Sequence, residues 1–137
     1  RPITRRGVGP VPAGDLTAAQ RAEVQRLLEH AERQSGLTFS AYIGAWDGGR
    51  EGAEALLERL ANPDRSVLVA VDPVGRQLEI VTGRLARIPL DDRACGLAAL
   101  SMTSSFTSGD TMGGLRDGLA VLGEHARRMR VEYIDQP

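Results

Sequence analysis

Hydroxyl and carboxylate side chains crowd one short segment of the chain, MTSSFTSGDTMGG, at residues 102–114. A serine or threonine nucleophile needs a base within hydrogen-bond reach and a third group that orients this base. The chain has two histidines, His30 and His125, and helical periodicity places both of them outside this segment. The G-x-S-x-G motif of a nucleophile elbow does not occur in the sequence. We therefore predict no catalytic residue here and interpret the hydroxyl groups as part of a helix surface.

The same segment has glycines beside a predicted helix N-terminus, where backbone N–H groups can hold an anion. These are Gly109, Gly113 and Gly114. Neither the Walker sequence nor a G-x-G-x-x-G sequence after a strand occurs in the chain. Asp110 comes just before the helix, and its carboxylate is a good N-cap that would occupy the N–H groups an anion needs. The sequence therefore favours a helix cap over a phosphate site.

Aspartates fall at the predicted ends of several elements, where calcium or magnesium would find oxygen ligands. They are Asp47, Asp64, Asp72, Asp91, Asp92 and Asp110. Aspartate is also common at turns and helix caps for structural reasons alone, and the sequence has no EF-hand loop. With two histidines and Cys95 as the single cysteine, it does not favour a transition-metal centre. A divalent-cation site and a set of caps both stay open.

Composition argues against two further classes of function. A net charge of −1 and few aromatic residues provide neither the positive field nor the stacking surfaces of a nucleic-acid-binding protein. All 17 basic residues are arginine, so a Schiff-base or P-loop lysine is ruled out. No apolar run approaches the roughly 20 residues of a membrane span. We expect no nucleic-acid partner, no transmembrane segment in this chain, and a location in the cytoplasm or at the periphery of a membrane.

Residues 1–15 are rich in proline, glycine and arginine and have few apolar anchors. This composition predicts a flexible basic N-terminal tail, and its three arginines would allow at most a peripheral contact with acidic lipid. We predict a single domain over residues 16–137, because a chain of this length suits one compact core.

Periodicity predicts a helix, a strand and a second helix in the first half of the chain. Thr17 and Gln20 form a capping-box pattern at the start of the first helix, and Gly36 ends it. Apolar and polar residues alternate over 39–45, which is typical of a strand with one buried face. A helix over 53–60 ends before the next proline.

The second half predicts two strands and two helices. Residues 66–72, SVLVAVD, are apolar up to the last position, as expected of a central strand covered on both faces. A short turn joins them to a strand over 77–83, so this pair is antiparallel, whereas the helical crossover makes the first two strands parallel. Asp91 or Asp92 caps the third helix, and Asp110 caps the fourth. The residues with helical spacing are Ala94, Leu97, Ala98, Ser101, Met102 and Phe106, then Leu115, Leu119, Leu122, Ala126 and Met129.

This order of elements predicts an α/β fold, a three-layer α/β/α sandwich in which about four helices flank a small mixed sheet. Four short motifs follow one another over residues 62–122. They are PDRSVLVAV with Asp64, DPVGRQLEIVTG with Arg76 and Gly83, LDDRA with Asp92, and FTSGDTMGGL with Phe106, Gly109, Asp110, Gly114 and Leu115. In this order and spacing the motifs resemble the TPM domain family, in an actinobacterial branch of uncharacterised function. The segment departs from the family pattern at Thr111, where a tyrosine is usual, at Ser66, where a glycine is usual, and in the loop GRLARIP.

The resemblance implies an α/β/α sandwich, and TPM relatives are associated with calcium binding, acid-phosphatase activity and accessory roles in assembling or repairing membrane complexes. Asp64, Asp92 and Asp110 match acidic positions of the family pattern and are the expected metal ligands. We expect a non-catalytic TPM-like domain that acts through a protein partner, in membrane-complex or cell-envelope maintenance, with an optional calcium site. The alternative is a metal-assisted acid phosphatase acting on phosphomonoesters. A regulatory ligand-binding domain would need a closed apolar pocket.

Overall fold

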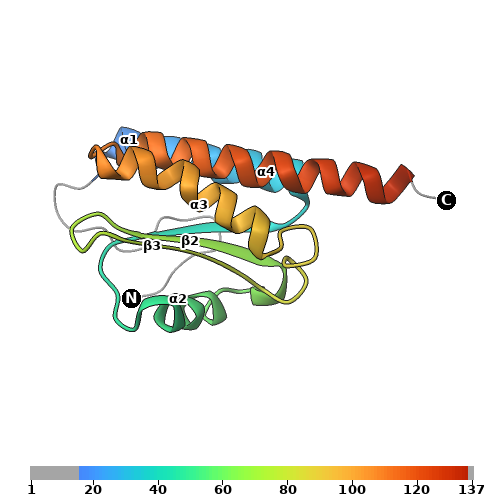
Figure 1. The fold of residues 1–137 in the computed structure, drawn as a ribbon, viewed down its shortest axis with the longest axis horizontal. Coiled ribbons are helices and arrows are strands. Elements are labelled where there is room, and N and C mark those ends of the chain that lie inside the picture. The colour runs from blue at the N-terminus through green and yellow to red at the C-terminus, as the bar shows by residue number, and fades with distance from the viewer. Residues whose placement is uncertain (1–15, 136–137) are drawn as a thin grey trace.

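The computed structural model describes residues 16–135, and it describes residues 131–135 as helix backbone only. The predicted tail at 1–15 lies outside these residues. The described part has a three-stranded mixed sheet between two layers of helices (Figure 1), so the predicted α/β sandwich is confirmed.

The strands lie side by side in the order β1 (Thr38–Ile43), β2 (Ser66–Asp72) and β3 (Gln77–Thr82). β1 is parallel to β2, because the chain returns through helix α2 (Gly49–Glu58) and the short 3₁₀ turn η1 (Pro63–Arg65) before β2 starts. β2 is antiparallel to β3, because four turn residues join them. Both directions agree with the prediction.

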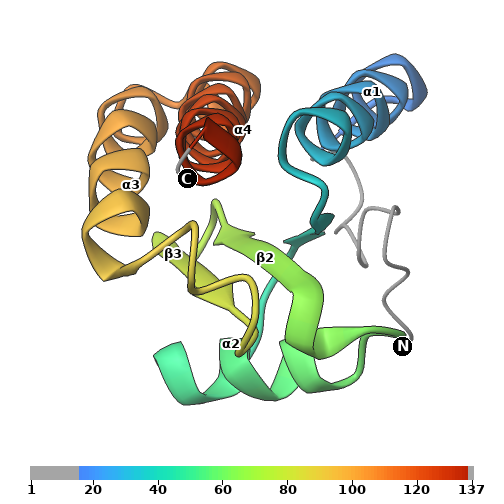
Figure 2. The same cartoon turned by 90° about the vertical axis from the view of Figure 1, so that its right-hand side faces the viewer.

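Helices α1 (Ala18–Ser35), α3 (Asp92–Thr107) and α4 (Thr111–Asp135) cover one face of the sheet, and α2 covers the other (Figure 2). β2 divides its side chains between the two layers: Val67, Val69 and Val71 belong to the core under the three helices, and Leu68 and Ala70 to the core under α2. Every residue of β2 is buried. Burial on both faces therefore explains the continuous apolar run in the sequence.

Side chains and glycines end the helices as the sequence predicts. The Thr17 hydroxyl accepts from the N–H of Gln20 at 3.1 Å, and the Gln20 side chain accepts from the N–H of Thr17 at 2.8 Å. Gly36 ends α1 with a left-handed φ of 75°. At α3 the cap is Asp91, whose carboxylate accepts from the N–H of Ala94 at 2.9 Å.

The segment 102–114 forms the corner between α3 and α4. Gly109 turns the chain with a φ of 85°, and Asp110 accepts from the N–H of Gly113 at 2.8 Å. A Cβ atom on Gly114 would overlap the ring of Phe106, so this glycine lets the end of α3 pack closely on α4. The corner is thus a helix end followed by a capped helix start, as predicted.

Two residues of the predicted core faces lie at the surface instead. Leu97 of α3 is 53% exposed and Met129 of α4 is 38% exposed. On α3 the buried stripe follows Ala94, Ala98 and Met102 at intervals of four residues. Leu97 is three residues from Ala94 and falls on the flank of this stripe, away from the core.

Candidate functional site

The three predicted metal ligands lie at the starts of three different elements. Asp64 is in η1, where its carboxylate lies 3.5 Å from the guanidinium of Arg84 and is 56% exposed. Its backbone carbonyl accepts from the N–H groups of Leu85 at 2.8 Å and Ala86 at 3.1 Å. Asp64 therefore holds the loop after β3 against the turn before β2.

Asp92 and Asp110 lie at opposite ends of α3. A helix of 16 residues is about 24 Å long, so these two carboxylates do not share one ion. Within residues 16–135, no three histidine, cysteine, aspartate or glutamate side chains whose positions are described form a group that could hold a metal. The structure therefore does not bring the predicted ligands together, and calcium binding at a single one of them stays a prediction.

A cleft of about 260 Å³ lies between the β2–β3 turn and the α3–α4 corner. Its lining includes Asp72, Arg76, Phe106, Thr107 and Thr111. The Asp72 carboxylate is buried and accepts from the N–H of Gly75 at 2.9 Å, which fixes the turn. Apolar residues such as Val71 and Leu78 also line this cleft, so its lining is mixed, and it opens to solvent. It therefore does not match the closed apolar pocket expected of a regulatory ligand-binding domain.

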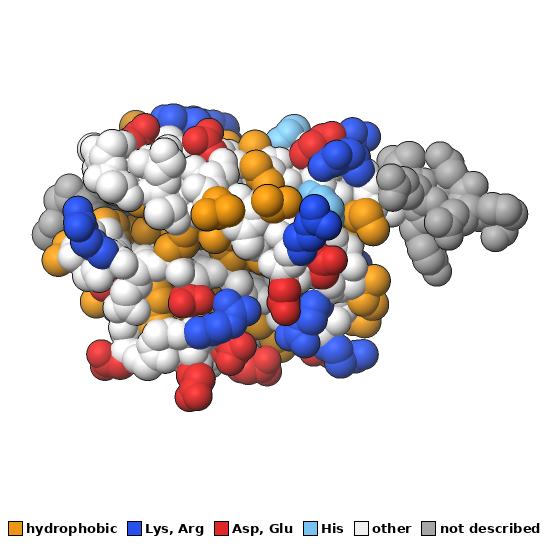
Figure 3. All heavy atoms as spheres, in the orientation of Figure 1, with side chains coloured by type: hydrophobic (Ala, Val, Ile, Leu, Met, Phe, Trp, Pro, Cys, Tyr) orange, Lys and Arg blue, Asp and Glu red, His pale blue; other side chains and the backbone are white. Residues whose placement is uncertain are grey.

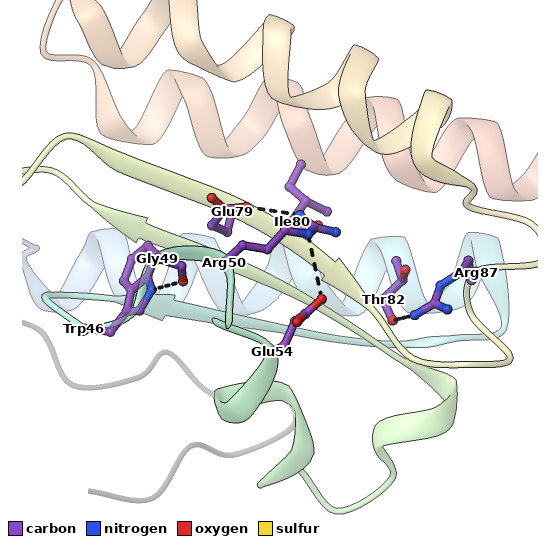
Figure 4. A network of polar contacts seen from close by, with 8 residues as sticks. All are labelled: Trp46, Gly49, Arg50, Glu54, Glu79, Ile80, Thr82 and Arg87. Atoms are coloured by element: carbon purple, nitrogen blue, oxygen red, sulfur yellow. Dashed lines mark hydrogen bonds and ion pairs between the residues drawn. The ribbon is translucent and has the colours of Figure 1, made fainter. Parts of the chain in front are cut away.

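The free edge of β3 carries a network of arginines. The Gly83 N–H donates to the Ser66 carbonyl at 2.9 Å, and the antiparallel alternation then turns the carbonyls of Ile80 and Thr82 away from β2. Arg50 of α2 lies 3.5 Å from the first carbonyl, and Arg87 donates to the second at 3.1 Å (Figure 4).

Neighbouring side chains hold Arg50 in this position. Its guanidinium donates to Glu79 at 3.1 Å and lies 3.8 Å from Glu54. The Trp46 indole donates to the Gly49 carbonyl at 2.8 Å, which fixes the start of α2 just before Arg50. The guanidinium groups of Arg50 and Arg87 contact backbone carbonyls at the edge of the sheet. Without these contacts, the carbonyls could accept hydrogen bonds from another strand.

A groove of about 280 Å³ separates this edge from α3 and contains Cys95 and Asp92. Burial raises the pKa of the Cys95 thiol to about 11, and the nearby charge of Asp92 adds to the effect. A raised pKa keeps the thiol protonated near neutral pH, which does not favour an activated cysteine nucleophile here.

Large apolar side chains lie exposed on α3, on the loop before it and on the adjacent part of α4. They are Ile88 at 75%, Leu97 at 53%, Leu100 at 71% and Met129 at 38% exposed, and we call them the apolar patch. Three of the four line a groove of about 350 Å³ between α3 and α4, together with Pro89, Asp91, Arg93, Ala94, His125 and Arg128. Figure 3 shows hydrophobic side chains reaching the surface over α3, with arginine and histidine side chains beside them.

Residues 10–123 match the family described as "Domain of unknown function (DUF5130)". This chain belongs to the DUF5130 family. Two relatives come from Mycobacterium tuberculosis, one of them named Uncharacterized protein Rv2468c, and each is 31% identical to this chain over 116 residues. The match covers 82% of this DUF5130 chain and 65% of each relative, so the chain spans just under two thirds of their length.

Solved structures share the fold of this DUF5130 domain. The N-terminal domain of the cg2496 protein from Corynebacterium glutamicum matches with a TM-score of 0.71 and 16% identity, over 86% of this chain and 78% of that one. The N-terminal domain of a protein from P. gingivalis matches with a TM-score of 0.69 and 19% identity, over 88% and 81% of the two chains. At these identities the likeness concerns the fold alone. Among the described helices of the DUF5130 domain, none is long and apolar enough to span a membrane.

The sequence interpretation missed the apolar patch. Leu97 and Met129 have helical spacing and therefore looked like core residues. One signal was available: Leu97 and Leu100 lie three residues apart, which forms a second apolar stripe on α3 beside the Ala94, Ala98 and Met102 stripe. A helix with two apolar stripes but only one core to face exposes one of them.

Proposed function

We propose that this DUF5130 domain is a TPM-like domain that acts without catalysis, by binding a protein partner through the apolar patch. The exposure of Leu97, Leu100 and Ile88 carries the proposal, because contiguous large apolar side chains on a protein surface mark interaction sites. The resemblance to the TPM family supports the finer setting, which is maintenance of a membrane complex or the cell envelope. An optional calcium ion at Asp64, Asp92 or Asp110 belongs to the same proposal.

Site-specific photo-crosslinking in an actinobacterial host tests partner binding. Benzoylphenylalanine in place of Leu100 is expected to yield one dominant crosslinked protein. The matched control is the same replacement at Val74, which is 80% exposed on the β2–β3 turn and outside the patch. Identical products from the two positions, or no product at position 100, would count against the patch as a partner site.

An activity measurement tests the phosphatase alternative. We expect the purified chain not to hydrolyse para-nitrophenyl phosphate above background, with or without magnesium or calcium. Metal-dependent hydrolysis that disappears in Asp110→Asn would replace the non-catalytic proposal by a metal-assisted acid phosphatase. Calorimetry with millimolar calcium tests the ion separately, since loop sites of this chemistry bind in that range.

A further inference from the structure

The groove between α3 and α4 has an apolar interior and cationic sides. Leu97, Pro89 and Met129 supply apolar surface, and Ala94 beneath them is buried. Arg93 stands on α3 and Arg128 stands on α4, so a positive charge accompanies each helix. A groove of this kind matches the surface that receives one face of an amphipathic helix.

The two arginines lack partners within the described part of the chain. Neither guanidinium forms a hydrogen bond or an ion pair with a described residue. Arg128 lies close enough to Glu124 to help lower the pKa of that carboxyl, but Glu124 is hydrogen-bonded to Arg127 at 2.6 Å. Among the described residues that line the groove, Asp91 is the one with an acidic side chain, and it is engaged as the N-cap of α3.

We infer that the α3–α4 groove binds an amphipathic helix of a partner protein whose apolar face carries leucine-like side chains and whose flanks are acidic. The apolar side chains enter between Leu97 and Met129, and the acidic flanks meet Arg93 and Arg128. This inference rests on the proposed function in one respect, that the partner is a protein.

A second copy of this chain fits the groove less well. A two-fold dimer places the same patch of both copies face to face. Such a dimer would enclose Arg93 and Arg128 of both copies in one interface, and the added positive charge disfavours association. A partner of opposite charge removes this repulsion and neutralises both sides.

A lipid surface shares the apolar and anionic chemistry but has a different shape. The groove is a concavity of about 350 Å³ with a helix on each side, and a convex ridge of side chains fills it better than a flat bilayer does. Membrane binding is therefore a competing outcome of the experiment below.

Fluorescence anisotropy with designed peptides on the full 137-residue chain tests the inference. The probe is a labelled helical peptide of about 16 residues with leucines at i, i+3, i+4 and i+7 and glutamates on both flanks. The control peptide replaces every glutamate by lysine. We expect saturable binding of the acidic peptide that weakens as salt is raised, and at least about tenfold weaker binding of the basic peptide.

Variants of the chain locate the binding site. Leu97→Ser and the double change Arg93→Glu with Arg128→Glu are each expected to weaken acidic-peptide binding about tenfold. The double change should also reverse the preference towards the basic peptide. The matched controls are Val74→Ser on the β2–β3 turn and Arg59→Glu next to α2 on the opposite layer, both exposed, and both should leave binding unchanged.

Several outcomes would contradict the inference that the groove binds an acidic amphipathic helix. These are equal binding of both peptides, no binding at millimolar peptide, binding that Leu97→Ser leaves intact, binding to anionic vesicles instead of peptide, or self-association by sedimentation that Leu97→Ser removes. If the peptides fail while the crosslink from position 100 captures a protein, the helix inference is wrong and the proposed function survives. If the crosslink also fails, both are wrong.

Discussion

The β3 edge and the apolar patch are two exposed surfaces of the same molecule. Side chains cover the backbone carbonyls of the edge, whereas the apolar side chains of the patch are exposed to solvent. At the edge, Arg50 and Arg87 cover outward carbonyls that would invite a neighbouring strand. On the neighbouring helix α3, the side chains of Leu97 and Leu100 are exposed to solvent. A surface that protects its backbone while exposing large apolar side chains indicates that the apolar exposure has a use other than folding.

The largest expected effect separates the patch from the core. Leu115 of α4 is fully buried, and Leu115→Ala should lower the free energy of unfolding by about 3 kcal/mol through lost burial and a cavity. Leu100→Ala should change it by no more than about 0.5 kcal/mol. Urea unfolding followed by circular dichroism measures both. Equal losses would mean that the patch is part of the core and would break the comparison.

A second prediction removes the edge protection. The double variant Arg50→Ala with Arg87→Ala should lose about 1.5 kcal/mol of stability, since two carbonyl contacts disappear, and should self-associate at high concentration. Sedimentation velocity over a concentration series measures the association. Arg59→Ala, at the C-terminal end of α2, is the control and should stay unchanged. A double variant that remains monomeric would show that the arginines do not protect the edge.

A third prediction concerns Asp110, which caps the N–H of Gly113 much as the arginines cap carbonyls. Asp110→Ala should cost about 1 kcal/mol, whereas Asp110→Asn should retain most of the cap. Thermal unfolding with and without calcium distinguishes a cap from a ligand. A loss that appears only in the presence of calcium would assign Asp110 to an ion site instead.

The smallest effect concerns an arginine that, unlike Arg93 and Arg128, has an acidic partner. Arg116 donates to Glu23 at 2.6 Å, and this hydrogen bond holds the pKa of Glu23 below its ordinary value. The pair therefore stabilises the folded chain at neutral pH, and this contribution disappears as the pH falls through the lowered pKa of Glu23. An NMR titration of the Glu23 carboxyl should show its pKa rising in Arg116→Ala. No change would mean that the pair does not form in solution.

Much of the fold could be predicted because local patterns determine it. The capping box at Thr17, the turn after Asp72 and the apolar run of β2 each reveal an element from a few neighbouring residues. The directions of the three strands then follow from the lengths of their connections.

The exposed surfaces could not be predicted in the same way. Arg50 contacts the carbonyl of Ile80, which lies 30 residues further along the sequence, and no local sequence pattern predicts this contact. Leu97 has the spacing of a core residue, and the second stripe that it forms with Leu100 shows that one stripe is exposed but not which one. The packing of α3 on α4 decides that Leu97 lies outside. The separation of Asp92 and Asp110 is different, because the predicted helix between them already implies a distance of about one helix length, too great for a shared ion.

Because the Cys95 thiol is protonated, we expect it to react slowly in chemical labelling. Because burial raises the pKa of this thiol to about 11, little of it is ionised at pH 7, and we expect thiol-directed dyes to react with it slowly. The chain has no other cysteine. A cysteine introduced in this chain at an exposed site such as Leu100 would therefore take up a dye before Cys95 does.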